Sequence, residues 1–203
     1  MELQDIEYHD DMGPLIIMGT GQDFERALVK AFNEFFELSG TKAIAYRRPQ
    51  TRYQPQLFDI FVDSRGSELY LAIECKQVDS DAYDSIYFSS HFGKTKGISQ
   101  VKRESDLLDL CGRNGILAIE SWSPSRRKRR AFLVPWKHVW YHFERGDPNI
   151  PQPVITSCPS IEKSGGKYSI DQDDMIAVIK SLDNPPRKIP RKWTKNINRE
   201  KTV

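Results

Sequence analysis

Residues 57–77 read LFDIFVDSRGSELYLAIECKQ, and they contain two strand patterns separated by a turn. Residues 57–63 alternate apolar and polar side chains, as a half-buried strand does, whereas residues 68–77 are an apolar run that becomes polar at its end. The intervening DSRG, residues 63–66, has the composition of a turn. We therefore predict two antiparallel strands joined as a hairpin.

Three charged side chains lie on this hairpin: Asp59 on the first strand, and Glu74 and Lys76 on the second. Side chains two positions apart on a strand point to the same face, so Glu74 and Lys76 are neighbours with Cα atoms about 6–7 Å apart. A turn at residues 63–66 places Asp59 near the level of Glu74, so two carboxylates can converge on one hard cation. This spacing alone is a weak signal, but charge directly after the apolar LYLAI is uncommon.

Such a set of side chains suits Mg²⁺, with Mn²⁺ as a substitute, because Mg²⁺ takes oxygen ligands and bridges to substrate phosphate. Asp59 and Glu74 are the predicted metal ligands, and Lys76 is predicted to orient the attacking water or to stabilise charge in the transition state. Glu25 lies in an upstream helix that would pack near this site, so it is a further candidate ligand. The alternative for Glu25 is an ordinary exposed helical glutamate.

The other elements are predicted from hydrophobic periodicity. Residues 22–38, QDFERALVKAFNEFFEL, have an aromatic face at helical spacing. The remaining predicted strands are at 41–48, 115–121 and 130–135. We predict a helix from residue 98 that ends at Gly112 or Gly115, a helix at 174–182 and a loop at about 146–166, and residues 136–146 form either a helix or a final strand. The resulting fold class is α/β, with a mixed central sheet and flanking helices.

The composition predicts one soluble domain. The 203 residues suit a single compact domain, or one with an appendage, and 29% charged residues leave no run of about 18 apolar residues for a membrane span. Residues 1–13 have no basic segment followed by an apolar run, so we expect no secretory signal. Cys75, Cys111 and Cys158 are odd in number and lack zinc spacing, which favours a reducing, cytoplasmic setting, or the host cytoplasm for a viral chain.

The chain resembles the PD-(D/E)XK nuclease superfamily and, within it, Holliday-junction resolvases of the archaeal and related viral or bacterial types. The resemblance is carried by GQDFERALVKAF, YRRPQ, LFDIFV, AIECKQ, and SQVKRESDLL followed by GILAIE, and it covers residues 19–143. It implies a restriction-endonuclease-like αβββαβ core and a homodimeric, metal-dependent endonuclease that cuts branched DNA by paired incisions. Phe58 stands where the family has a proline, residues 49–56 replace a Ser/Gly-rich loop, and the tract from Pro148 onwards has no counterpart.

On this resemblance the chain divides into an N-terminal extension (1–18), a nuclease core (19–145), a C-terminal extension packing on the core (146–184) and a flexible basic tail (185–203). The tail holds seven Lys/Arg and one Glu, which suits either contact with an anionic polymer or mere solubility. Residues 126–130 are five consecutive cations. We predict that they either contact the DNA backbone or form a solvated hairpin tip. The predicted DNA-binding residues are Arg47, Arg48, Arg52, Lys94, Lys96, Gln100, Lys102, Arg126, Arg127, Lys128, Arg129 and Arg130.

Two other functions stay open at this point. A nuclease of the same fold could act on linear duplex, as restriction or repair enzymes do. A DNA-binding module could keep the fold without the chemistry, although the complete set of Asp59, Glu74 and Lys76 argues against it.

Overall fold

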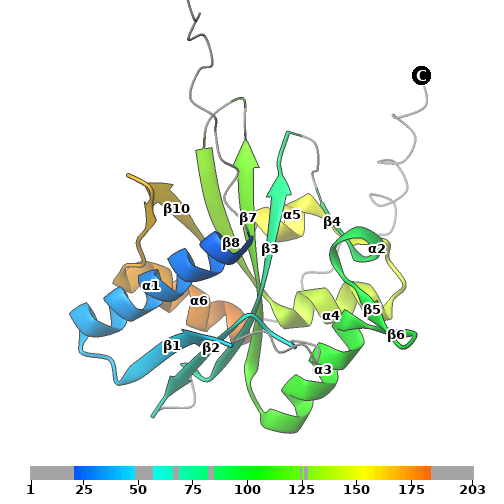
Figure 1. Cartoon of the computed structure of the whole chain (residues 1–203), viewed down its shortest axis with the longest axis horizontal. Helices are drawn as coiled ribbons and strands as arrows, with labels where there is room; N and C mark the ends of the chain where they lie inside the picture. The colour runs from blue at the N-terminus through cyan, green and yellow to red at the C-terminus, as the bar shows by residue number, and fades with distance from the viewer. Residues whose placement is uncertain are drawn as a thin grey trace, which may run out of the picture.

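The computed structural model describes residues 21–48, 57–65, 69–81, 85–123, 125 and 128–183. Its centre is a seven-stranded mixed sheet with the strand order β1-β2-β3-β7-β8-β10-β11 (Figure 1). β3 and β7 are parallel, and all other neighbouring pairs in the sheet are antiparallel. The strands are β1 (Ala43–Arg47), β2 (Ile60–Ser64), β3 (Leu71–Asp79), β7 (Asn114–Ser123), β8 (Lys128–Pro135), β10 (Ser160–Ser164) and β11 (Lys167–Tyr168).

Helices cover both faces of this sheet, with α1 and α6 on one side and α3, α4 and α5 on the other (Figure 1). Two small antiparallel pairs, β4 with β9 and β5 with β6, lie outside it. The bounds of these elements are α1 (Gly21–Ser39), β4 (Ile86–Tyr87), α2 (Phe88–His91), β5 (Lys94–Thr95), β6 (Ile98–Ser99), α3 (Gln100–Cys111), α4 (Trp136–Glu144), β9 (Asn149–Ile150), α5 (Gln152–Thr156) and α6 (Gln172–Asp183). Within the described ranges, no helix has the length and apolar character needed to cross a membrane.

The aromatic face of α1 explains why this helix packs on the sheet. Phe24, Leu28 and Phe32 recur at intervals of four residues and are at most 1% exposed. The Phe24 ring meets the Tyr168 ring edge-on at 5.8 Å, which joins the start of α1 to the last strand of the sheet. The predicted helix at residues 22–38 is therefore confirmed, and its inner face is the predicted one.

Asn33 fixes α1 over the edge strand β1. Its Nδ2 donates to the Ala45 carbonyl oxygen at 2.9 Å, and its Oδ1 accepts from the Ala45 N–H at 2.8 Å. Both backbone groups would otherwise be unpaired at the edge of the sheet. This double hydrogen bond places Glu25, two turns earlier on α1, above the end of β1.

Two predictions about the second half of the chain have clear outcomes. The open choice at residues 136–146 is resolved as a helix, because Trp136 and Val139 are both buried at helical spacing. The predicted loop at about 146–166 is wrong, because β9, α5 and β10 lie there. β10 reads SIEKS with only Ile161 buried, so its strand conformation comes from pairing with β8 and not from an apolar pattern of its own.

Gly115 allows α3 to pack closely against β7 and α4. A Cβ atom there would lie 2.4 Å from Leu108 Cδ1 and 2.6 Å from Trp136 Cβ. We expect Gly115→Ala to lower the free energy of unfolding by about 1–3 kcal/mol through overpacking, measured by urea denaturation. Gly21→Ala is the control, since no atom lies within 4 Å of its added Cβ. Equal stability of both variants would contradict this packing.

Candidate active site

Asp59 lies directly before β2 and is held against β3 by backbone hydrogen bonds. Its N–H donates to the Ile73 carbonyl oxygen at 3.1 Å, and its Oδ2 accepts from the Cys75 N–H at 2.8 Å. The next residue, Ile60, pairs with Ile73 in the antiparallel register. The structure therefore places Asp59 level with Glu74, next to the point where β3 continues beyond its partner β2.

Glu74 and Lys76 lie on the same face of β3 and form an ion pair. Lys76 Nζ is 2.5 Å from Glu74 Oε1, with side chains 19% and 5% exposed, and it also lies 5.3 Å from the centre of the Phe92 ring. Burial alone would lower the pKa of Lys76, but the Glu74 carboxylate beside it raises that pKa above its ordinary value. Lys76 is therefore a charged ammonium at neutral pH.

The electrostatics of Asp59 show that the acids are close together. Burial, and then the charge of Glu74, raise the pKa of Asp59 to about 6, although the Cys75 N–H and Lys76 act in the opposite direction. Asp59 and Glu74 are two carboxylates in one partly buried region, where the nearby positive charge does not neutralise both. Ionisation of one therefore opposes ionisation of the other. A divalent cation between them would relieve this repulsion, so the oxygen-only donor set fits Mg²⁺ or Mn²⁺.

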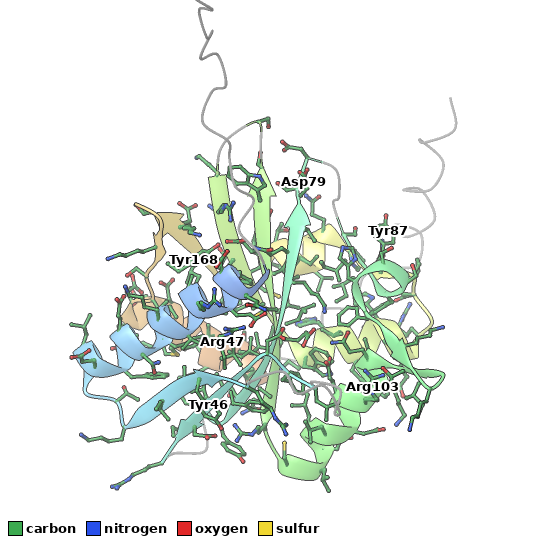
Figure 2. All side chains as sticks on the ribbon, in the orientation of Figure 1. Tyr46, Arg47, Asp79, Tyr87, Arg103 and Tyr168 are labelled. Carbon is green, nitrogen blue, oxygen red and sulfur yellow. The ribbon has the colours of Figure 1, made fainter. Side chains whose placement is uncertain are left out.

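Glu25 reaches the same region from α1, where Arg47 binds it. Glu25 Oε2 lies 2.6 Å from Arg47 Nη2 and 2.7 Å from Arg47 Nε, and Figure 2 labels Arg47 beside α1. Burial, and then the charge of Asp59, raise the pKa of Glu25 above its ordinary value. The Arg47 guanidinium is therefore the hydrogen-bonded ion-pair partner of Glu25 in this structure.

In the part of the chain that is described, no set of three or more His, Cys, Asp or Glu side chains lies within reach of a single metal ion. The predicted trio of Glu25, Asp59 and Glu74 is therefore not assembled as one group. Mg²⁺ commonly needs only one or two carboxylates, with water and substrate phosphate as its other ligands. Asp59 and Glu74 meet that requirement chemically.

The predicted DNA-binding cations occupy different surroundings. Lys94 and Lys96 are exposed on the β5–β6 hairpin, which projects beside the start of α3, and Arg48 is exposed at the end of β1. Lys102 is also exposed and pairs with Asp106 on its own helix. Arg52, Arg126 and Arg127 lie outside the described residues.

The cations of β8 are separated by strand alternation. Arg129 pairs with Glu120 at 3.3 Å, on the same face of the sheet as Tyr168, whose hydroxyl donates to Glu120 at 2.7 Å. Lys128 and Arg130 point to the opposite face, where Arg130 pairs with Glu162. Arg129 is therefore part of a buried polar cluster, whereas Lys128 and Arg130 line an open surface.

Two buried acids, Glu120 and Glu104, were not among the site residues predicted from the sequence. Glu120 is 1% exposed, and Glu104 on α3 is fully buried. Glu104 follows Gln100 by four residues and lies on the same helix face as Val101 and Leu108, both buried. The sequence signal that could have identified Glu104 is a carboxylate at a position that continues an apolar helix face, because acids without a partner rarely occupy such positions.

Gln100, a predicted DNA contact, lies between Glu74 and Glu104. Its Nε2 donates to Glu74 Oε1 and to Glu104 Oε1, both at 2.7 Å. Its Oε1 accepts from the Gly93 N–H at 3.2 Å, and its own N–H donates to the Gly93 carbonyl oxygen at 2.8 Å. Gln100 therefore connects the candidate site to the interior of α3.

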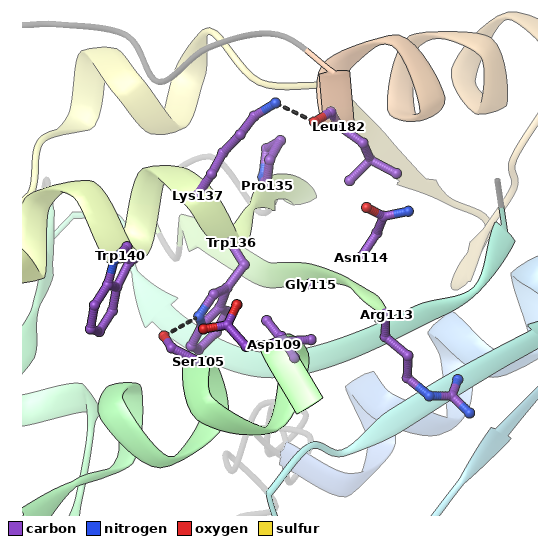
Figure 3. A pocket seen from close by; sticks show the side chains of 11 residues that line it. Ser105, Asp109, Arg113, Asn114, Gly115, Pro135, Trp136, Lys137, Trp140 and Leu182 are labelled. Carbon is purple, nitrogen blue, oxygen red and sulfur yellow. Dashed lines mark hydrogen bonds between the residues drawn. The ribbon is translucent and has the colours of Figure 1, made fainter. Parts of the chain in front are cut away.

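A separate cavity of about 240 Å³ lies between α3, α4 and the end of α6 (Figure 3). In it Trp136 Nε1 donates to Ser105 Oγ at 2.9 Å, and Lys137 donates to the Leu182 carbonyl oxygen. The lining residues are Ser105, Leu108, Asp109, Arg113, Asn114, Gly115, Pro135, Trp136, Lys137, Trp140 and Leu182. None of the predicted site residues is among them, so this cavity is distinct from the carboxylate site.

No protein-family model matches the chain, and no curated protein does. Among solved structures, the chain is similar to Hjc, a Holliday junction resolvase from the archaeal hyperthermophile Archaeoglobus fulgidus. The identity is 20%, the TM-score is 0.37, and the match covers 64% of this chain and 92% of that one.

Proposed function

We propose that this protein is a Mg²⁺-dependent endonuclease that hydrolyses DNA phosphodiester bonds, with four-way junctions as its substrate. The observation that carries the proposal is the juxtaposition of Asp59, Glu74 and the ammonium of Lys76 at one end of the β2–β3 pair. In this proposal Asp59 and Glu74 ligate the cation, and Glu25 is a further ligand or positions one. When bound, the cation polarises a phosphoryl oxygen and lowers the pKa of its water.

The protein's own groups supply the remaining parts of the chemistry. Lys76 carries its charge at neutral pH, so its ammonium can donate to the attacking water or to a phosphoryl oxygen as negative charge develops. The Cys75 N–H fixes one oxygen of Asp59, which orients that carboxylate before substrate arrives. Arg47 lies beside Glu25, where its guanidinium can exchange this carboxylate for a phosphate of the bound strand.

The arrangement of the elements also supports the proposal. α1, β1, β2, β3, α3 and β7 follow each other in the order of the predicted αβββαβ core, interrupted only by short elements. An open groove of about 440 Å³ is lined by Lys128, Arg129 and Arg130, by Glu162, which pairs with Arg130, and by Ser121 and Ser123. Cations and hydroxyl groups are the usual contacts of a DNA backbone, so this groove is the proposed place for a duplex arm.

A cleavage assay tests the proposal and separates it from the two rivals. We expect the purified chain in Mg²⁺ to nick opposite strands of a labelled four-way junction, at least about tenfold faster than it cuts linear duplex of the same sequence. EDTA should stop the reaction, and Mn²⁺ should restore it. Equal cutting of linear duplex would favour a restriction- or repair-type enzyme. DNA binding without cleavage in either metal would favour a non-catalytic module.

A further inference from the structure

Glu104 is the most deeply buried acid near the candidate site, and the proposed chemistry does not use it. Its side chain is fully buried on the inner face of α3. Oε1 accepts from Gln100 Nε2, whereas Oε2 is buried and has no hydrogen-bond partner among the described residues. Burial, and then the charge of Glu74, raise the pKa of Glu104 to about 10, so the group is an uncharged acid at neutral pH.

The contacts of Gln100 show what this acid holds in place. The side-chain amide nitrogen of Gln100 donates to both Glu104 Oε1 and Glu74 Oε1, and its amide oxygen accepts from the Gly93 N–H. Both ends of the amide are therefore fixed. Glu74 Oε1 also accepts from Lys76 Nζ, so both side-chain hydrogen bonds that Glu74 makes within the described ranges go to Oε1. Oε2 is the oxygen of Glu74 that remains for a cation.

A purely structural role does not explain an acid at this position. A buried oxygen without a partner costs about 1–3 kcal/mol, and an apolar side chain of similar size would avoid that cost. The neighbours Val101 and Leu108 are apolar and buried, so this face of α3 accepts such a side chain. The carboxyl group of Glu104 therefore has a use that leucine could not supply, and among the described residues its hydrogen bond goes to Gln100.

We propose that Glu104 is a positioning residue: through Gln100 it fixes Oε1 of Glu74, so that Oε2 is presented to the divalent cation. This role rests on the proposed function, because it requires Glu74 to be a metal ligand. Partners of ligating carboxylates typically change metal affinity 10- to 100-fold when they are removed. The effect of Glu104 should therefore appear in metal binding itself.

The test compares Glu104→Leu and Glu104→Gln with the wild-type chain by Mn²⁺ titration, followed by electron paramagnetic resonance, and by urea unfolding. Glu104→Leu is expected to be at least as stable as the wild type and to bind Mn²⁺ about 10- to 100-fold more weakly. Glu104→Gln retains an acceptor for Gln100 and should bind within about threefold of the wild type. Asp106→Leu is the control for replacing an acid of α3 by leucine, because Asp106 is exposed on the same helix.

Gln100→Met provides a second route to the same result, should Glu104→Leu not fold. It removes the connecting amide and should weaken Mn²⁺ binding to a similar degree. Wild-type binding in Gln100→Met or in a folded Glu104→Leu would overturn the role of Glu104, even if the wild-type chain bound Mn²⁺ and cut DNA. If the wild-type chain bound no Mn²⁺ at all, the proposed function would fail, and the role of Glu104 with it.

Discussion

Asp59→Asn is expected to reduce hydrolysis of a labelled junction by about 10³-fold or more and, at the same time, to stabilise the fold above pH 6. The first effect follows because a metal ligand contributes several kcal/mol to the stabilisation of transition-state charge. The second follows from the raised pKa of Asp59, since its ionised form is repelled by Glu74 and poorly hydrated. Loss of activity with a gain in stability identifies a functional carboxylate.

The sign of the stability change follows from proton binding. The pKa of Asp59 is raised from 3.8 to about 6 in the folded chain, so between these pH values the folded state binds more protons than the unfolded state. Wild-type stability therefore falls as pH rises through this window and stays lower above it. Asparagine does not ionise, so the variant avoids this fall and should be more stable at pH 7–8 by on the order of 1–3 kcal/mol.

Urea unfolding at pH 4 to 8 without metal measures this difference, with Asp106→Asn as the exposed control. The stability of Asp106→Asn should stay within about 0.5 kcal/mol of the wild type. Adding Mg²⁺ should stabilise the wild-type chain above pH 6 and leave the Asp59→Asn variant unchanged, since only the wild type binds the ion. An Asp59→Asn variant that cuts DNA normally, or that is less stable than the wild type at pH 8, would refute the role of Asp59.

The local part of this site could be predicted because it depends on one hairpin. The antiparallel register of β2 and β3 pairs Ile60 with Ile73 and so places Asp59 level with Glu74, although Asp63 and Ser64 belong to β2 and not to the turn predicted at 63–66. Strand alternation then gives the common face of Glu74 and Lys76. Each of these steps needs only neighbouring sequence, so the prediction did not depend on how distant parts of the chain pack.

The partners of Glu25 and Arg129 could not be predicted in the same way. Arg47 reaches Glu25 because Asn33 ties α1 to β1, a contact between residues that no sequence period connects. Arg129 belongs to a run of cations, but it pairs with Glu120 because β7 and β8 bring them to the same face. Charge patterning shows that cations are clustered and does not show which of them are already neutralised.

Lys76→Gln is expected to lower hydrolysis about 10²–10³-fold while Mn²⁺ binding is retained. The ammonium of Lys76 is the group placed to stabilise developing charge, and removal of one such donor has effects of this size. Glutamine still donates a hydrogen bond to Glu74 Oε1, so the buried carboxylate keeps a partner and the fold is preserved. Lys30→Gln is the control, because Lys30 is an exposed lysine on α1 that pairs with Glu34 and belongs to none of the predicted sites.

Separate measurements of metal binding and of hydrolysis distinguish the role of Lys76 from that of Asp59. Losing Asp59 should abolish both properties, because it removes a ligand. Losing the charge of Lys76 should leave Mn²⁺ affinity equal or higher, since the ammonium no longer competes with the cation for Glu74 Oε1. Titration of Mn²⁺ together with single-turnover cleavage measures both quantities in the same preparation. If the Lys76→Gln variant lost Mn²⁺ binding in proportion to its activity, Lys76 would only support Glu74, and the attacking water would need another partner.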